Sequence, residues 1–398
     1  MKEGWTYKKL GEVAEVSAGQ GAPQGDSNYS LEGTPFVKAG NLSDLINGVS
    51  ESSIQKVSEE VAKSHKLKLY KAGSVLFAKS GMSCMKGFIY TLKSDCYVVS
   101  HLAIITPYSV NSHFLNYYLR YNKPNSLIKD EAYPSISLKD IENLQIPFPP
   151  IAEQERIVAE LDLLSGVIEK KKEQLKAYDQ LAQSIFYTMF GDPITNEKGW
   201  DVKSLNDLSS LICNGNTPKG GSEVYVEKGV LFLRSQNVWK NRLELEDVAF
   251  IDEDTHSKLK KSALKHNDLL ITKTGRINTE NSSLGRTALF EGKDGSANIN
   301  GHVYLVRLKQ GVLHKFVLYI LISESYRELI RKTCVGGIDK RQLNRDHIEN
   351  FPIILPPSSL QLSFIERVEA IERQKALVQQ SIDETQTMFD YTMDKYFG

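Results

Sequence analysis

Two long stretches of the chain carry apolar residues at alternating spacings of three and four, the pattern of a helix that packs along a narrow seam. They are residues 151–190 and 360–397, which contain one glycine and no proline between them. A Pro-Pro pair precedes each stretch, which is a natural boundary before a helix. We therefore expect two long helices with coiled-coil-like packing. The seam positions are Ile157, Leu161, Leu164, Ile168, Lys171, Leu175, Tyr178, Ala182, Ile185 and Met189, and then Phe364, Val368, Ile371, Lys375, Val378, Ile382, Thr385 and Phe389.

Short apolar runs bounded by turn residues fill the rest of the chain and are typical of buried strands. Segments with helical spacing lie between them. The chain outside the two long helices is thus expected to be mixed α/β. The predicted strands are residues 75–78, 102–105, 269–272 and 303–306, and the predicted shorter helices are residues 114–121 and 315–331.

The chain also repeats itself, at an offset that varies between 194 and 207 residues. Gly4-Trp5 returns as Gly199-Trp200, and the Lys-Ser-Gly that ends at Gly81 returns as the Lys-Thr-Gly that ends at Gly275. The varying offset places insertions in loops between shared elements; residues 276–284, for example, have only a short counterpart after Gly81. A common scaffold that carries different loops is typical of a recognition architecture.

The repeat divides the chain into four segments. Residues 1–150 and 193–357 are two similar mixed α/β domains, and residues 151–192 and 358–398 are the helices that separate and follow them. The formal net charge of zero hides a pattern, because the domains carry +2 and +4 whereas each helical segment carries −3. Basic domains suit a phosphate backbone, although an excess this small predicts modest affinity from this chain alone.

Composition narrows the class of protein further. Hydrophobic residues make up 41% and charged residues 25% of the chain, and no window is apolar enough to cross a membrane. We therefore expect a soluble, cytoplasmic protein with no membrane partner. The four cysteines form no CxxC pair and have no histidine cluster beside them, so we expect reduced, mostly buried thiols and no metal site.

Residues 146–158 read IPFPPIAEQERIV, which is an apolar strand, Pro-Pro, and then Glu-Gln and Arg-Ile at the start of a long helix. Together with the Gly-Trp starts, the strands that end in Lys-Ser/Thr-Gly and the histidine before a strand, this resembles the specificity subunit of type I restriction-modification systems. No single motif is specific, but the resemblance covers the whole chain and its order of parts matches twice.

The resemblance implies that both globular segments are target-recognition domains, each reading one half of a split site in double-stranded DNA. It also implies that the helices pair as an antiparallel coiled coil around a pseudo-two-fold repeat. They would act as a spacer and dock two modification (methyltransferase) subunits, to which ATP-dependent restriction subunits are added. Glu153, Gln154 and Arg156 of the first helix are the implied partner-binding residues. The second copy departs from the pattern, with Leu360 and Ser363 in place of Glu153 and Arg156.

Catalytic motifs are absent from the sequence. Neither Pro-Pro pair belongs to the (Asp/Asn)-Pro-Pro-aromatic loop of an amino-methyltransferase, and there is no Pro-Asp dipeptide for a nuclease of the PD-(D/E)xK type. Gly19-Gln-Gly21 does not complete a GxGxxG loop, and no GxxxxGK(S/T) loop exists, so no cofactor is expected. We expect a non-catalytic DNA-recognition subunit. A stand-alone DNA methyltransferase or nuclease and a purely structural coiled-coil adaptor are the alternatives.

DNA contact then depends on polar and basic side chains in loops. Arginine can hold guanine O6 and N7 with two bonds, whereas lysine and serine more often hold phosphate. The alternative for each turn is a solvated charge with no ligand. The candidates at the strand ends are Lys79, Ser80, Gly81, Lys273, Thr274 and Arg276, and the second group is Lys340 and Arg341 after Gly336-Gly337.

Two further pairs of residues are weaker candidates. Ser135 and Ser137 are polar and precede a predicted helix, and for Ser135 we favour an N-cap before Leu138 over DNA contact. His101 and His302 occupy matching places without a recognisable nucleophile motif nearby, so a buried or turn-stabilising role is favoured over catalysis.

Overall fold

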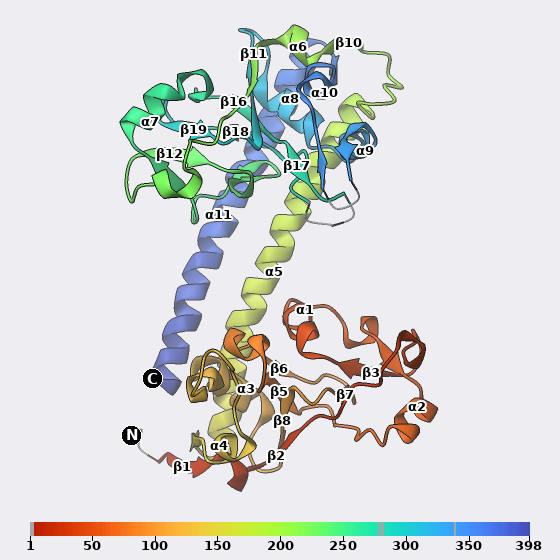
Figure 1. The fold of residues 1–398 in the computed structure, drawn as a ribbon, viewed down its shortest axis with the longest axis vertical. Coiled ribbons are helices and arrows are strands. Elements are labelled where there is room, and N and C mark those ends of the chain that lie inside the picture. Colours follow the sequence, from red (N-terminus) through yellow and green to blue (C-terminus); the bar gives the residue numbers. More distant parts are fainter. Residues whose placement is uncertain (1–3, 278, 280–281, 338–339) are drawn as a thin grey trace. The chain divides into compact units, whose positions relative to one another are not determined.

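A computed structural model describes residues 4–277, 279, 282–337 and 340–398. The chain divides into two compact units (Figure 1), one formed by residues 1–172 with 379–398 and the other by residues 173–378. Each unit therefore contains one mixed domain together with a part of each long helix. No helix among the described residues is long and apolar enough to span a membrane.

The first unit is built on a four-stranded antiparallel sheet with the strand order β2-β8-β5-β6. The central strand β5 is buried along its whole length, as its unbroken apolar sequence predicts. A second sheet has the order β4-β3-β7, in which β3 is antiparallel to β4 and parallel to β7. β1 pairs with β9, which brings the start of the domain beside the entry to the long helix. The strands are β1 (Thr6–Lys9), β2 (Ala14–Ala18), β3 (Thr34–Val37), β4 (Lys56–Val57), β5 (Val75–Ala78), β6 (Ile89–Thr91), β7 (Tyr97–Val98), β8 (Leu102–Pro107) and β9 (Gln145–Phe148).

The second unit repeats this topology strand by strand. Its main sheet has the order β11-β20-β16-β18, its smaller sheet the order β15-β12-β19, and β10 pairs with β23. The repeat seen in the sequence is therefore also a repeat of strand order and direction. These strands are β10 (Asp201–Ser204), β11 (Ser209–Asn214), β12 (Val230–Leu233), β15 (Ala249–Ile251), β16 (Asp268–Thr272), β18 (Thr287–Phe290), β19 (Ala297–Ile299), β20 (Val303–Leu308) and β23 (Pro352–Leu355).

The second unit also has additions to the shared topology. They are a hairpin of β13 (Val238–Trp239) and β14 (Arg242–Leu243), and a small sheet of β17 (Thr274–Gly275), β22 (Arg341–Gln342) and β21 (Val335–Gly336) in that order.

All four predicted strands are confirmed, whereas one predicted helix divides into two. The segment expected at residues 315–331 forms α8 (His314–Leu321) and α9 (Glu324–Thr333), separated by the fully buried Ser323. The Ser323 hydroxyl donates to the Ile320 carbonyl at 2.7 Å and accepts from the Tyr326 amide at 3.4 Å, so it satisfies backbone groups at both helix ends. The other short helices are α1 (Leu42–Ile46), α2 (Glu59–Ser64), α3 (Ser112–Tyr121), α4 (Leu138–Glu142), α6 (Leu205–Leu208), α7 (Glu253–Lys258) and α10 (Arg345–Glu349).

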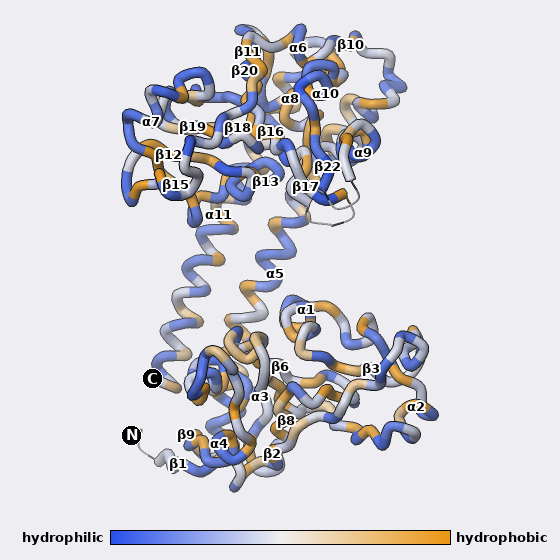
Figure 2. Tube along the Cα trace, viewed as in Figure 1, coloured by the Kyte–Doolittle hydropathy of each residue, from blue (hydrophilic) through white to orange (hydrophobic). Residues whose placement is uncertain are grey.

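The two long helices are α5 (Ile151–Phe190) and α11 (Ser358–Phe397), and both begin directly after a Pro-Pro pair, as predicted. Figure 2 shows polar and apolar residues mixed along both helices. The predicted seam is buried or half-buried throughout.

Within each unit the two helices run antiparallel. In the first unit Arg156 Nη2 donates to the Tyr396 hydroxyl at 3.0 Å, and further along α5 Lys171 Nζ lies 3.3 Å from the Ser381 carbonyl. Later residues of α5 therefore lie beside earlier residues of α11. In the second unit the lysine of the other seam, Lys375, forms an ion pair with Asp179.

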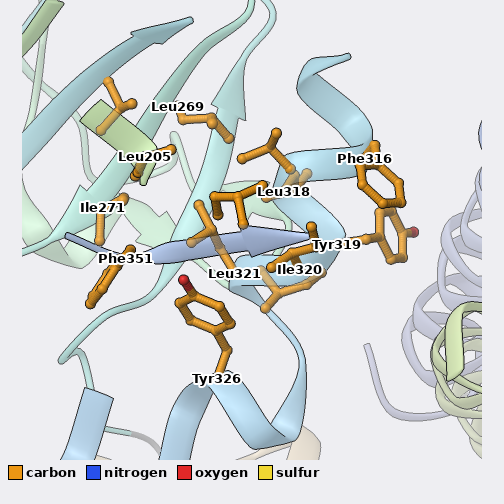
Figure 3. Packing of buried hydrophobic residues seen from close by; sticks show 14 of the residues in the cluster. Leu205, Leu269, Ile271, Phe316, Leu318, Tyr319, Ile320, Leu321, Tyr326 and Phe351 are labelled. Carbon is orange, nitrogen blue, oxygen red and sulfur yellow. The ribbon is translucent and has the colours of Figure 1, made fainter. Parts of the chain in front are cut away.

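The helices also belong to the core of the second unit. Phe186 and Phe190 of α5 are fully buried and pack with Phe316 of α8 and Phe364 of α11, with ring centroids of Phe190 and Phe316 5.0 Å apart. Figure 3 shows part of the same cluster, in which aliphatic and aromatic side chains from the main sheet, from α8 and from α9 lie together. Here the buried face of α5 is wider than the predicted seam, because the helix packs on the domain of residues 193–357 as well as on α11.

Candidate nucleic-acid interface

A polar turn follows the central strand of the main sheet in both domains. β5 leads into Lys79-Ser80-Gly81, and β16 leads into Lys273-Thr274-Gly275. The Lys79 amide donates to the His101 carbonyl at 2.9 Å, and the Lys273 amide donates to the His302 carbonyl at 2.8 Å. The same backbone bond thus holds the first residue of both turns against the strand beside it.

A distant segment of chain completes each turn. The Ile136 amide donates to the Lys79 carbonyl at 2.8 Å, and the Leu343 amide donates to the Lys273 carbonyl at 2.9 Å. We call residues 79–82 with 133–136 platform 1, and residues 273–276 with 340–343 platform 2. In platform 2 the added segment is strand β22, which pairs with both β17 and β21.

The platforms unite residues that are separate candidates in the sequence. Ser135 forms an antiparallel bridge with Ser80, and Arg341 pairs across the sheet with Gly275 and with Gly336. The N-cap expected at Ser135 is wrong, because it is the Ser137 hydroxyl that accepts the Asp140 amide at 3.0 Å and caps α4. Ser135 lies too early in the chain to cap this helix, and its backbone is used in the bridge.

The two matching histidines support the turns. His101 Nδ1 lies 2.9 Å from the Ser80 hydroxyl, and His302 Nδ1 lies 3.4 Å from the Thr274 hydroxyl. Both histidines are exposed, so of the two expected roles the structure favours stabilisation of the turn over burial.

Basic side chains gather at platform 2. Lys273 Nζ lies 5.8 Å from the centre of the Tyr304 ring, while Arg276 and Lys340 are exposed. Arg341 is half-buried, and its Nη1 lies 3.5 Å from the Cys334 carbonyl. Its Nε is buried and has no hydrogen-bond partner among the residues that the structure describes. An unsatisfied charged donor is costly, so this guanidinium is a candidate for binding a ligand.

Platform 1 presents different side chains on the same backbone. Met82 and Tyr133 are 71% and 81% exposed, and the Gly81 amide, next to Met82, donates to the carbonyl of Pro134, next to Tyr133. Sequence reasoning missed both residues, because only the folded chain brings them to one edge. An exposed apolar pair beside a polar turn suits contact with base edges or thymine methyl groups.

Two glycines are required by the geometry of the turns. Gly81 has φ +75°, which side chains rarely tolerate. A Cβ at Gly275 would lie 2.4 Å from the Leu284 amide nitrogen and 2.8 Å from the Ser282 hydroxyl. Residues 282–284 therefore pack directly on the backbone of Gly275.

The three residues proposed for partner binding lie at the start of α5 and differ in exposure. The Arg156 guanidinium is bound by both carboxylate oxygens of Glu153 at 2.8 Å. These bonds, followed by the bond to Tyr396, raise the pKa of Arg156. The Arg156 side chain is 52% exposed and the Glu153 side chain 32% exposed, so the pair still presents a surface.

Gln154, by contrast, is fully buried. Its Nε2 donates to the Pro149 carbonyl and its Oε1 accepts the Asn111 amide, both at 2.8 Å. Gln361 occupies the same place in the second copy, where its Nε2 donates to the Pro356 carbonyl at 2.7 Å. The glutamine therefore fixes the junction between Pro-Pro and the long helix, and it offers no surface to a partner.

Other chemistry is limited in the described part of the chain. It contains no group of three or more His, Cys, Asp or Glu side chains placed to hold a metal ion. All four cysteines are buried thiols, as expected, and burial raises the pKa of Cys96 to about 12.

A family model described as the type I restriction modification DNA specificity domain matches the chain twice, over residues 2–177 and 197–386. Among similar proteins, the type I restriction enzyme MjaIX specificity subunit of Methanocaldococcus jannaschii is 22% identical over 390 residues, which cover 92% of this chain and 86% of that protein. The MjaVIII specificity subunit of the same organism is 24% identical over 391 residues, which cover 94% of this chain and 87% of that protein.

Solved structures share the fold. The S subunit of a type I restriction-modification system from M. genitalium superposes with a TM-score of 0.53 at 13% identity, covering 99% of this chain and 96% of that one.

Proposed function

The chain belongs to the family of type I restriction-modification DNA specificity subunits, and from this premise we propose that its two recognition domains read the two halves of a bipartite DNA target. Membership explains the duplicated topology, because two domains of one kind are what a split target requires. The proposed domains are residues 1–150 and 193–357.

One observation carries the proposal. Both domains build a platform with the same backbone hydrogen bonds, from Lys79 and Ile136 in one and from Lys273 and Leu343 in the other, yet they present different side chains on it. Two domains that bind different DNA half-sites need such a constant backbone with variable side chains.

We assign DNA contact to both platforms. In platform 1 the ligand groups are Lys79, Ser80 and the backbone at Gly81. In platform 2, Arg276 and Arg341 suit guanine, because a guanidinium can bind O6 and N7 together. The lysines suit phosphate. The remaining ligand groups of platform 2 are Lys273, Thr274 and Lys340.

The helical segments 151–192 and 358–398 are proposed to pair as an antiparallel coiled coil that docks two modification subunits, to which ATP-dependent restriction subunits are added. The antiparallel packing within each unit supports this role. The Glu153–Arg156 pair supplies an exposed surface at the start of α5, whereas Gln154 is a structural residue.

In this proposal the chain contributes recognition, and its partners contribute catalysis. A stand-alone methyltransferase or nuclease is the competing function. The two are separated by incubating the purified chain with S-adenosylmethionine and target DNA, with and without the modification subunit. Methyl transfer by the chain alone would contradict the proposal.

Methylome sequencing of cells that express this chain with its modification partner gives the direct test. We expect one methylated motif of two parts with a fixed gap. Replacing residues 193–357 with the corresponding domain of another family member should change one half of the motif only. The matched control replaces residues 1–150, which should change the other half. A change in both halves after either exchange would show that the domains do not read independently.

A further inference from the structure

A second group of basic side chains lies on domain 2 outside platform 2. Lys240 and Arg242 come from the β13–β14 hairpin, Arg286 precedes β18, and Arg327 comes from α9. Trp239 stands among them, with the Arg286 guanidinium carbon 3.8 Å and the Arg242 guanidinium carbon 5.3 Å from the centre of its ring. We call these five residues the tryptophan cluster.

Backbone contacts hold the cluster in place. Trp239 and Arg242 are paired across the hairpin, and its turn residue Asn241 has φ +60°. The Asn241 amide donates to the Thr287 carbonyl at 2.9 Å, which ties the turn to the start of β18. The hairpin therefore belongs to the rigid sheet rather than to a loose loop.

The positive charges converge on one pocket. Lys240, Arg286 and Arg327 line a narrow cavity of about 30 Å³ together with apolar side chains such as Leu284 and Ile330. Burial, and then the charges of Arg327 and Arg242, lower the pKa of Arg286. Three basic side chains therefore lie close together at this pocket.

The neighbouring acidic groups leave Arg242 and Lys240 able to bind a phosphate. Arg242 donates its Nε–H to Glu244 at 2.7 Å in an exposed ion pair. Burial lowers the pKa of Lys240, and the charge of Glu324 opposes this shift. An exposed pair contributes little, and a guanidinium has further N–H donors. Both residues are exposed on the surface. The guanidinium of Arg242 lies over the Trp239 ring, and a guanidinium has planar N–H donors that suit phosphate.

The cluster adjoins platform 2 through one pair of strands. The Thr272 amide donates to the Arg286 carbonyl at 2.9 Å, and the Arg286 amide donates to the Thr272 hydroxyl at 2.8 Å. Thr272 leads directly into Lys273 and Thr274 of the platform. A duplex read by the platform therefore has its sugar-phosphate backbone close to the tryptophan cluster.

We propose that Lys240 and Arg242, which lie beside Trp239 and Arg286, bind backbone phosphates of the DNA duplex without regard to sequence. The inference rests on the proposed function, because it presupposes that a duplex lies on platform 2. In domain 1 the residue that corresponds to Arg286 is Phe88, which also stands between a glycine and the first residue of its strand. Domain 1 thus lacks an arginine at this position.

The test compares two double variants of the full chain, each purified with its modification partner. Lys240→Gln/Arg242→Gln removes two exposed charges from the cluster, and Lys260→Gln/Lys261→Gln removes two exposed charges from elsewhere in the same domain. DNA affinity is measured between about 50 and 200 mM salt on duplexes with and without the target. Each lost phosphate contact should lower the slope of log K against log salt by about 0.9. At about 0.1 M salt this weakens binding roughly eightfold per contact if the affinity extrapolated to 1 M is unchanged.

The cluster variant should therefore lose affinity on both duplexes alike, with its methylated motif unchanged, while the control variant keeps the wild-type slope. Lys240→Arg/Arg242→Lys retains the charges and should restore the slope if phosphate contact, rather than folding, is what the first variant lost. Equal slopes for the cluster variant and the control would overturn the inference, and so would an altered motif, which would mean that the cluster reads bases.

Two further outcomes separate the sources of phosphate and the two proposals. If inorganic phosphate raises the melting temperature through Lys240 and Arg242 while the DNA slope stays unchanged, the cluster binds free anions and the inference is wrong. If the wild-type complex shows no preference for a target duplex, the proposed function fails. A salt slope that still depends on the cluster would then support phosphate binding by itself.

Discussion

Replacing Arg341 with methionine should affect stability and DNA recognition in opposite directions. Arg341 Nε is buried with no hydrogen-bond partner among the described residues, and Nη1 lies 3.5 Å from the Cys334 carbonyl. A buried donor in this state costs about 1–3 kcal/mol. Methionine has a similar length and flexibility and no donor to satisfy, so Arg341→Met should raise the free energy of unfolding by about 1 kcal/mol.

The same change removes a guanidinium from the centre of platform 2. Loss of a two-bond contact with guanine costs roughly 1–3 kcal/mol of discrimination, or about 5- to 150-fold in affinity for the correct target. For a unit of this size, a gain of about 1 kcal/mol corresponds to an increase of roughly 2–4 °C in melting temperature. Thermal unfolding of the chain and DNA titration of its complex with the modification subunit measure the two effects separately.

The matched control is Lys228→Met, which removes one exposed charge from the same domain. It should change neither the melting temperature nor the preference for the target. The reasoning would be refuted if Arg341→Met destabilised the protein by 2 kcal/mol or more while target preference stayed at the wild-type level. That result would mean that the guanidinium supports the fold and has no role in recognition.

Three further predictions test the framework of the two domains and the starts of the long helices. Gly275→Ala should cost about 1–3 kcal/mol in a thermal melt and weaken DNA binding, because its Cβ would meet a backbone nitrogen at 2.4 Å. Arg307→Met should cost roughly 3 kcal/mol in urea unfolding, because it leaves the Asp268 carboxylate, 1% exposed, without its bidentate partner; Asp268→Asn in the same chain should recover part of the loss. Gln154→Leu breaks two buried hydrogen bonds and should cost roughly twice as much as Gln361→Leu, in which one such bond is identified; equal losses would contradict the assignment.

The sequence predicted the elements of this fold better than their contacts. Long seams and short apolar runs predict helices and buried strands, because burial imposes a period on the residues. The division at Ser323 was missed, since a single hydroxyl that satisfies two helix ends leaves no trace in that period. Phe186 and Phe190 were likewise left out of the seam, because their burial depends on Phe316 of α8 and Phe364 of α11, which lie far away in the sequence.

Part of the candidate site could also be predicted from the sequence. The repeat singled out the turns at Gly81 and Gly275, and the pattern of glycine and basic residues singled out Arg341. Which of these residues meet is decided by strand pairing across more than fifty positions of sequence, as in the bridge between Ser80 and Ser135. The tryptophan cluster gave no local signal, because its members lie in a hairpin, just before a strand and in a helix.

The two copies also show which features of a recognition domain are required by the fold. Both keep the backbone bonds at Lys79 and Lys273 and the glutamine that follows Pro-Pro, because a buried polar group that loses its partner costs about 1–3 kcal/mol. At the rim, Met82 in one copy corresponds to Arg276 in the other, and both are exposed. Exposed positions of this kind usually change stability by less than about 0.5 kcal/mol. The side chains that would contact DNA can therefore vary with almost no effect on folding, so one scaffold can carry two different specificities in a single chain.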